Sequence, residues 1–157
     1  MKWVARRLVW AAVVGCFLVI WSADEHRNIV AAQGRRPVTI TRIYTGPDGQ
    51  SHAEEIDVKL APMAGIARYE RSETVKLTGL NFQRWSPGYV NDWHPAHGRQ
   101  YVMTLSGRGE VEIFGGQKIP LEPGRILLFE DVTGKGHISR ALGTEDCVSV
   151  HASLPDL

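Results

Sequence analysis

From Pro37 onward, the chain alternates between short runs of β-forming residues and turns rich in glycine and proline. Residues 55–60 alternate polar and apolar side chains at period two, as a half-buried strand does. Further strands are predicted for runs of similar length and composition, at residues 38–44, 74–77, 80–85, 101–105, 110–114, 126–130 and 147–152. No window after residue 37 keeps a helical period, so the sequence predicts an all-β fold, a sandwich or a barrel.

The amino terminus has a different composition. Three basic residues, Lys2, Arg6 and Arg7, precede an uncharged apolar run over residues 8–23. This pattern predicts a hydrophobic helix over residues 1–23 that serves as an export signal or a membrane anchor. Residues 24–36 are then a polar linker, and residues 37–157 form the β domain.

Cleavage of this amino-terminal segment is left open by the sequence. The apolar run is shorter than the roughly 20 residues of a comfortable membrane span, which favours a signal peptide. A cut after Ala32 would suit a signal peptidase but lies well past the apolar run, which favours a retained anchor. Acylation of Cys16 is a third, less favoured interpretation, because the apolar run continues past it. Each alternative places the domain outside the cytoplasm, in the periplasm or as a secreted or anchored protein.

Charge and cysteine content exclude some functions. The chain has a net charge of +1, but three of its 18 basic residues lie in the amino-terminal segment, leaving 15 basic against 17 acidic residues in the remainder. Nucleic-acid binding is therefore not expected. Cys147 is the single cysteine after the amino-terminal segment, so it has no partner for an internal disulfide and is expected to be a small buried side chain.

Histidines are concentrated around two predicted strands. His94 and His97 precede the strand that begins near Gln100, and His137 follows the glycine-rich turn Gly134-Lys-Gly136. Residues two apart in a strand share one face, so His94, Gln100 and His137 are expected to converge in the interior of a barrel. The glycine turn is expected to let His137 approach that interior. His151 alternates with Ser149 and Cys147 and is expected to pack in the core or at its rim.

Residues 85–152 resemble a small single-domain cupin. Gln100 lies seven positions before Gly107, where the first cupin motif has a glutamate, and His94 takes the place of the first motif histidine. The second motif histidine falls on Ala96, with His97 one residue out of step. The second motif is approximated by residues 121–124 followed by His137.

The resemblance implies an antiparallel jelly-roll barrel with a site in its lumen, and residues 38–60 are expected to add edge strands. It also implies a divalent transition metal, namely zinc, iron, manganese, nickel or copper. Neutral imidazole suits zinc, iron, nickel and copper in particular. The implied ligands are His94, Gln100 and His137. His97 is either a fourth ligand or a surface turn residue, because it lies one position off the strand register. Cupins also commonly pair through edge strands, so the resemblance implies a homodimer.

Gln100 departs from the family pattern. An amide holds a divalent cation less strongly than a carboxylate and cannot act as a base near neutral pH, so chemistry would need another acid or base. Glu130 and Asp131 are the nearest candidates in the sequence, and no catalytic residue is identified. Trp93, Tyr101 and Glu130 are expected to line the pocket.

Three functional hypotheses follow. The first is an exported or membrane-anchored protein with a small-molecule pocket, which as an enzyme would be a metal-dependent dioxygenase or isomerase. The second is a non-enzymatic ligand-binding or sensor barrel without metal, favoured by the loss of the anionic ligand at Gln100. The third is a structural accessory subunit. Because one fold hosts many chemistries, the sequence does not determine the substrate or the reaction.

Overall fold

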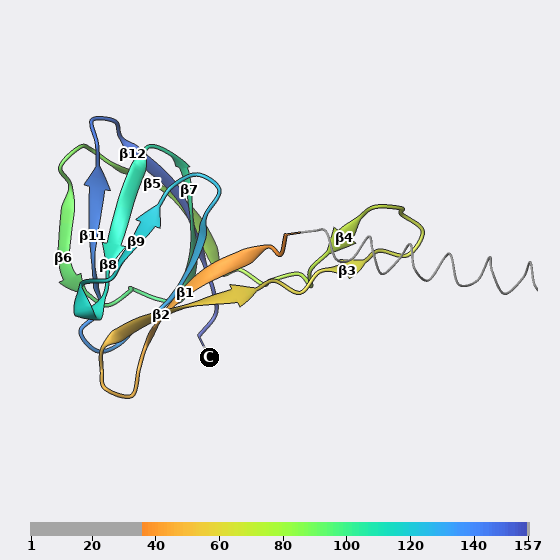
Figure 1. Ribbon diagram of the computed structural model, residues 1–157, viewed down its shortest axis with the longest axis horizontal. Coiled ribbons are helices and arrows are strands. Elements are labelled where there is room, and N and C mark those ends of the chain that lie inside the picture. Colours follow the sequence, from red (N-terminus) through yellow and green to blue (C-terminus); the bar gives the residue numbers. More distant parts are fainter. Residues whose placement is uncertain (1–35, 157) are drawn as a thin grey trace, which may run out of the picture. The chain divides into compact units, whose positions relative to one another are not determined.

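The computed structural model describes residues 36–156, which fold into β-strands joined by loops and turns, without an α-helix in this range (Figure 1). Val38–Leu157 form one compact unit, close to the predicted domain boundary. The predicted signal or anchor over residues 1–23 lies outside the described residues, and so does nearly all of the linker. No helix within residues 36–156 is long and apolar enough to cross a membrane.

Twelve strands and one short 3-10 turn make up the described chain. They are β1 (Thr39–Thr45), β2 (Ser51–Asp57), β3 (Ala61–Pro62), β4 (Glu70–Arg71), β5 (Gly79–Trp85), β6 (Val90–His94), β7 (Gln100–Ser106), β8 (Arg108–Glu112), η1 (Phe114–Gly116), β9 (Lys118–Leu121), β10 (Ile126–Glu130), β11 (His137–Leu142) and β12 (Cys147–Ser153). The predicted strand at residues 74–77 is not a strand, and β3, β4, β6, β9 and β11 were not predicted.

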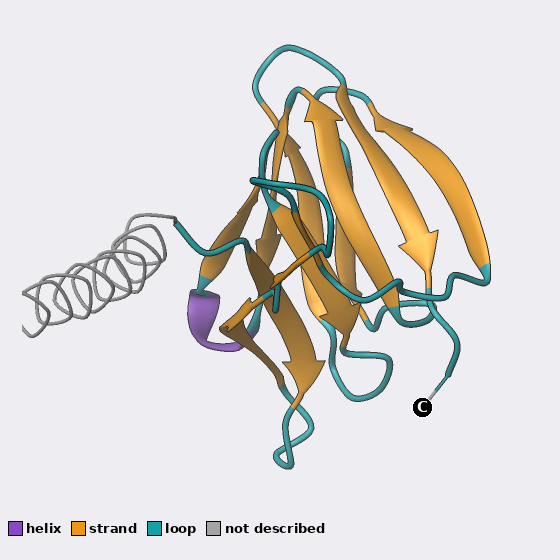
Figure 2. Ribbon diagram, turned by 90° about the vertical axis from the view of Figure 1, so that its right-hand side faces the viewer, coloured by secondary structure: helices purple, strands orange, loops and turns teal. Residues whose placement is uncertain are grey.

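The last eight strands pair in a nested order: β5 with β12, β6 with β11, β7 with β10, and β8 with β9. This nesting of antiparallel pairs defines a jelly roll. It places β10, β7, β12 and β5 side by side in one sheet and β6, β11, β8 and β9 in the other, and Figure 2 shows the strands of the barrel side by side. The predicted jelly-roll barrel is therefore confirmed by the topology of the strands.

Two further strands extend the larger sheet to six in the order β2-β1-β10-β7-β12-β5, as expected for residues 38–60. One pairing departs from the antiparallel prediction, because β1 runs parallel to β10. These two strands are far apart in the sequence and no hairpin joins them, so no short connection forces an antiparallel arrangement.

The core fills the space between the two sheets. Alternation along β7 turns Val102 towards this core, while Tyr101 and Met103 point to the outer face of the larger sheet. The remaining core side chains are large and aliphatic or aromatic, and come from both sheets: Ile43, Val111, Ile113, Ile119, Leu121, Leu127 and Phe129. Cys147 is buried without a disulfide partner, and burial raises the pKa of its thiol, consistent with the predicted packing role.

Candidate functional site

A cavity of about 150 Å³ lies in the lumen at one end of the core. Its wall combines imidazoles, amides, a hydroxyl and aromatic rings, contributed by Gln83, Trp85, Tyr89, Asn91, His94, Ala96, His97, Gln100, Val102, Leu121, Phe129, His137, Ser139 and His151. Strands of both sheets supply these residues, so the cavity forms only when the barrel closes.

His137 is the most firmly held histidine of this cavity. Its Nδ1–H donates to Oδ2 of Asp131 at 2.7 Å, and the hydroxyl of Ser51 donates to the same oxygen at 2.8 Å. His137 is 3% exposed, and Asp131 and Ser51 are fully buried. With Nδ1 protonated, the neutral ring carries its lone pair on Nε2. The carboxylate therefore fixes both the orientation and the tautomer of His137.

His94 lies opposite His137 on the neighbouring strand β6. The two ring centroids are 4.5 Å apart. The Nδ1–H of His94 donates to the backbone oxygen of Asp92 at 2.7 Å, and Nε2 accepts from the amide of Asn91 at 2.9 Å. Burial lowers the pKa of His94, and the nearby His137 adds to the shift, which the Asp92 carbonyl opposes. His94 is therefore neutral at neutral pH.

Gly136 makes the close approach of β11 and β6 possible. Its φ is +73°, and a Cβ at this position would lie 1.9 Å from the backbone oxygen of His94. Only glycine fits such a left-handed conformation at this distance from a neighbouring backbone. The predicted role of the Gly134-Lys-Gly136 turn, which was to let His137 approach the lumen, is confirmed.

His151 and Gln100 form a second buried pair. The Nδ1–H of His151 donates to Oε1 of Gln100 at 3.1 Å, and Nε2 accepts from the hydroxyl of Ser149 at 3.0 Å. Both ring nitrogens of His151 are therefore satisfied, as expected for a histidine packed in the core. The amide oxygen of Gln100, the atom expected to ligate a metal, already accepts a hydrogen bond from His151.

Acid sensitivity follows from the burial of His151. Burial lowers its pKa from 6.5 to about 4, so the unfolded chain binds a proton first as the pH falls. The stability contributed by neutral His151 is present above pH 6.5 and is lost as the pH falls towards 4. We expect a loss of about 3 kcal/mol at pH 4 from this residue. Urea denaturation from pH 7 to pH 4 measures it.

A matched pair of variants isolates this effect. His151→Gln keeps a polar group but cannot titrate, so its stability should fall less with pH than that of the wild type. His97→Gln removes an exposed histidine and should keep the wild-type pH profile. A wild-type profile in His151→Gln would contradict the assignment.

The four expected metal ligands all line the cavity, but their arrangement is not that of a complete metal site. The rings of His94 and His97 are 6.4 Å apart, and His97 is exposed. Within residues 36–156, no three or more His, Cys, Asp or Glu residues are grouped so that they could hold a metal ion. Of the four expected ligands, only His94 and His137 therefore have their rings close together.

The three other expected pocket residues lie elsewhere. Tyr101 faces the outer side of the larger sheet, and Trp93 packs against the ammonium of Lys135, 4.2 Å from the ring centroid. Glu130 also lies on the outer side of that sheet, because it follows the inward-facing Phe129 by one position. None of the three lines the lumenal cavity.

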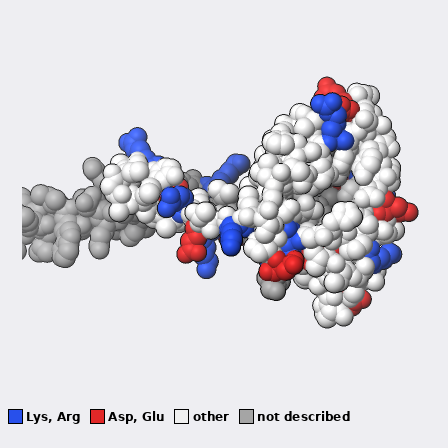
Figure 3. Space-filling model, turned by 180° about the vertical axis from the view of Figure 1, so that it is seen from behind, with Lys and Arg blue, Asp and Glu red and all other residues white. Residues whose placement is uncertain are grey.

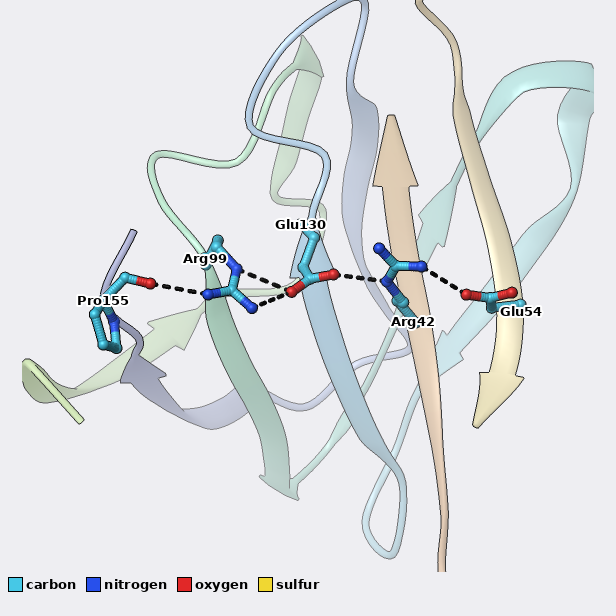
Figure 4. Close-up of polar contacts among 5 residues, drawn as sticks. All are labelled: Arg42, Glu54, Arg99, Glu130 and Pro155. Atoms are coloured by element: carbon cyan, nitrogen blue, oxygen red, sulfur yellow. Dashed lines mark hydrogen bonds and ion pairs between the residues drawn. The ribbon is translucent and has the colours of Figure 1, made fainter. Parts of the chain in front are cut away.

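Glu130 joins an ion-pair network instead (Figure 4). Arg42 donates to one carboxylate oxygen at 2.6 Å, and Arg99 donates to the other at 2.9 Å. Arg42 also bonds Glu54, and Arg99 the backbone oxygen of Pro155. Burial alone would raise the pKa of Glu130, but the hydrogen bonds from Arg99 and Arg42 outweigh it and lower the pKa. Glu130 is therefore a structural anion and not a proton acceptor for the cavity.

Sequence reasoning missed Ser51, Asn91 and Ser139. Ser51 is separated from Asp131 by 80 positions, and only the pairing of β2, β1 and β10 in one sheet brings the two together. Asn91 and Ser139 lie on β6 and β11, which were not predicted as strands. That Asn91 and Ser139 lie opposite each other could have been inferred only if these two segments had been predicted as paired strands.

No protein-family model matches this chain, and no curated protein matches it. Among solved structures, the chain is similar to the protein NMB1881 from Neisseria meningitidis, with 20% identity and a TM-score of 0.38 over 59% of this chain and 91% of that chain. It is also similar to a putative ethanolamine utilization protein Q from Salmonella typhimurium, with 12% identity and a TM-score of 0.36 over 77% and 98%. These likenesses add nothing to what the strand topology already shows about the fold.

Proposed function

We propose that this protein binds a small polar molecule in the lumenal cavity, with His137 as the main hydrogen-bonding group. The observation that carries the proposal is a pair of buried hydrogen bonds that link Ser51 to Asp131 and Asp131 to His137. They fix the Nδ1–H tautomer of His137 and leave its Nε2 as an acceptor. A buried carboxylate that holds an imidazole in one orientation is a costly arrangement, typical of functional sites. The jelly-roll topology and the cupin-like motifs of the sequence also support a lumenal site.

The ligand class follows from the cavity. At about 150 Å³ it is smaller than the 300–1,000 Å³ typical of sites for drug-sized molecules, which favours a ligand of few heavy atoms. The amides of Asn91 and Gln83 and the hydroxyl of Ser139 favour a ligand with hydroxyl or carbonyl groups.

The amino-terminal sequence supports a location outside the cytoplasm.

A divalent transition metal held by His94 and His137 is the second candidate. Each of these histidines donates its Nδ1–H to an oxygen acceptor, as metal-binding histidines usually do. A bound ion would supply Lewis acidity. Two features weigh against a metal: Nε2 of His94 is already bonded to Asn91, and the oxygen of Gln100 is bonded to His151. We therefore favour the metal-free binding protein.

Ligand binding and metal content can be tested on residues 33–157, purified without a histidine tag or chelators. A panel of small hydroxy and keto compounds is screened by thermal shift, and metal is quantified by mass spectrometry, before and after reloading. We expect substoichiometric metal and a compound-dependent rise in Tm. The rise should disappear in His94→Ala/His137→Ala.

His97→Ala, at the exposed edge of the cavity, serves as the matched control and should retain most of the response. Near-stoichiometric metal in the wild type that is absent from the double variant would favour the second candidate. A ligand response that survives loss of both histidines would contradict the role given to His137.

A further inference from the structure

Residues 58–78, which we call the arm, leave the barrel after β2 and return to it at β5. The arm contains the two-residue strands β3 and β4, which pair only with each other, and Figure 1 shows them beyond the end of β2, away from the two main sheets. Backbone hydrogen bonds fix both ends of the arm to the barrel: Val58 N to Val38 O at 2.8 Å and Thr78 N to Ser153 O at 2.9 Å. The arm is therefore a defined projection.

The arm is unusually apolar for an exposed segment. Its tip is closed by a hydrogen bond from Met63 N to Tyr69 O at 3.1 Å, and there Ile66 is 52% exposed and Tyr69 44%. Exposed apolar patches on soluble proteins mark sites that contact another protein or a membrane. Six of the 15 large hydrophobic residues that are exposed in residues 36–156 lie in the arm: Leu60, Met63, Ile66, Tyr69, Val75 and Leu77.

Charge also sets the arm apart from the barrel. The rest of residues 37–157 has eight basic and 13 acidic residues, so the arm is net positive on a domain that is otherwise net negative. Figure 3 shows the arm as a largely uncharged lobe with Lys and Arg side chains along its edges. An anionic surface would therefore attract the arm and repel the remainder of the domain. The charged residues of the arm are Lys59, Arg68, Arg71 and Lys76, against Glu70 and Glu73.

We propose that the arm docks on an anionic lipid bilayer, with Ile66 and Tyr69 inserted at the level of the headgroups and the arginines beside them in contact with lipid phosphates. Arg68 lies between these two apolar residues and Arg71 follows them, so cations and apolar side chains reach the surface together. The long aliphatic stem of arginine packs along apolar surface while its guanidinium binds phosphate. Tyrosine favours the membrane interface because one end of its ring is apolar and the other polar.

The shape of the arm favours a bilayer over a protein partner. A narrow projection with apolar residues at its tip needs a complementary pocket in a protein partner, because specific interfaces are packed as closely as protein interiors. A fluid headgroup layer admits the same side chains without a preformed pocket. This proposal does not depend on the proposed function of the lumenal cavity.

The attachment of the arm gives a further reason, which rests on the anchor alternative for residues 8–23. Val58, at the root of the arm, is bonded to Val38, where the barrel begins. The chain between residue 23 and Val38 spans at most about 50 Å when fully extended. An anchored chain would therefore keep the arm close to the bilayer, where a modest affinity is enough for docking.

Co-sedimentation of residues 33–157 with lipid vesicles tests the arm without the amino-terminal apolar run, since Val38–Leu157 form a compact unit of their own. We expect the wild type to bind vesicles of equal parts phosphatidylcholine and phosphatidylglycerol about 10-fold or more tightly than vesicles of phosphatidylcholine alone. Added NaCl should weaken this binding, because salt screens exposed charges.

Two variants of the arm separate the apolar from the charged contribution. Ile66→Ser/Tyr69→Ser should weaken binding to the mixed vesicles by about 10-fold or more. Arg68→Gln/Arg71→Gln should weaken it by a similar factor and remove most of the preference for phosphatidylglycerol. The matched controls make the same changes at exposed positions outside the arm and should bind like the wild type: Phe114→Ser/Leu142→Ser and Arg84→Gln/Arg108→Gln.

Circular dichroism on the same samples shows whether each variant keeps its fold. A wild type that does not bind the mixed vesicles, or a tip variant that binds them like the wild type, would overturn the proposal. Self-association of the wild type without vesicle binding, lost in the tip variant, would assign the arm to a second copy of the chain instead. Vesicle binding without any ligand response in the cavity would support the arm's role and contradict the proposed function.

Discussion

Asp131→Ala is expected to destabilise the protein by roughly 3–5 kcal/mol, the cost typical of breaking a buried ionic or strongly hydrogen-bonded pair by removing one partner. The substitution leaves the Nδ1–H of His137 and the hydroxyl of Ser51 buried without their common acceptor. Loss of the carboxylate also frees the ring of His137 to rotate and to change tautomer, so binding in the lumenal cavity should be lost. Urea denaturation at pH 7 and ¹⁵N chemical shifts of the His137 ring measure the two effects.

Two neighbours provide the controls. Ser51→Ala removes one of the two donors to Asp131 and should cost only about 1–2 kcal/mol while leaving the His137 tautomer unchanged. Glu130→Ala alters the ion-pair network on the outer face, and we expect it to leave the ¹⁵N shifts of His137 unchanged. If Asp131→Ala costs less than about 1 kcal/mol, or leaves the His137 tautomer as it was, the carboxylate does not have the role described here.

Gly136→Ala is expected to disrupt the site by a backbone clash. The added Cβ would lie 1.9 Å from the backbone oxygen of His94, so β11 and β6 must separate where His137 and His94 face each other. We expect a loss of roughly 3 kcal/mol or more, the sum of the left-handed strain and the displacement. Chemical denaturation reports the loss of stability, and the thermal response to ligand reports the loss of the cavity.

Gly143→Ala is the matched control. Gly143 also has a positive φ, of +83°, but no atom outside its chain neighbours lies within 4 Å of a Cβ built there. It should therefore cost only the left-handed strain of about 1–2 kcal/mol and leave ligand binding unchanged. Equal losses in the two alanine variants would mean that the close approach to His94 is not what requires glycine at position 136.

The histidine cluster shows how far sequence reasoning reached. Four residues expected to share a site, His94, His97, Gln100 and His137, do line one cavity. The sequence could not determine how their nitrogen and oxygen atoms are used. The oxygen of Gln100 bonds His151 and Nε2 of His94 bonds Asn91, and both partners come from tertiary pairing.

Glu130 and Asp131 show most clearly what the sequence could not determine. Adjacent residues of a strand point to opposite faces, so only one of these two acids can face the lumen. The preceding residues 126–129 are all apolar, so their pattern does not indicate whether the odd-numbered or the even-numbered side chains face the lumen. The structure places Phe129 in the core, Glu130 among outer arginines, and Asp131 against His137.

By itself, the sequence determined the all-β class, the domain that begins near residue 37, and the residues around which a site could form. These properties depend on local features, namely strand period, turn residues and side-chain chemistry. The tertiary structure alone decided the parallel pairing of β1 with β10, the hydrogen bonds that link Ser51 through Asp131 to His137, and the exposure of the apolar side chains in residues 58–78. The physical reason is that strand alternation defines two faces but not which face is buried. A contact across 80 residues, such as that of Ser51 with Asp131, is made only when β2, β1 and β10 pair in one sheet.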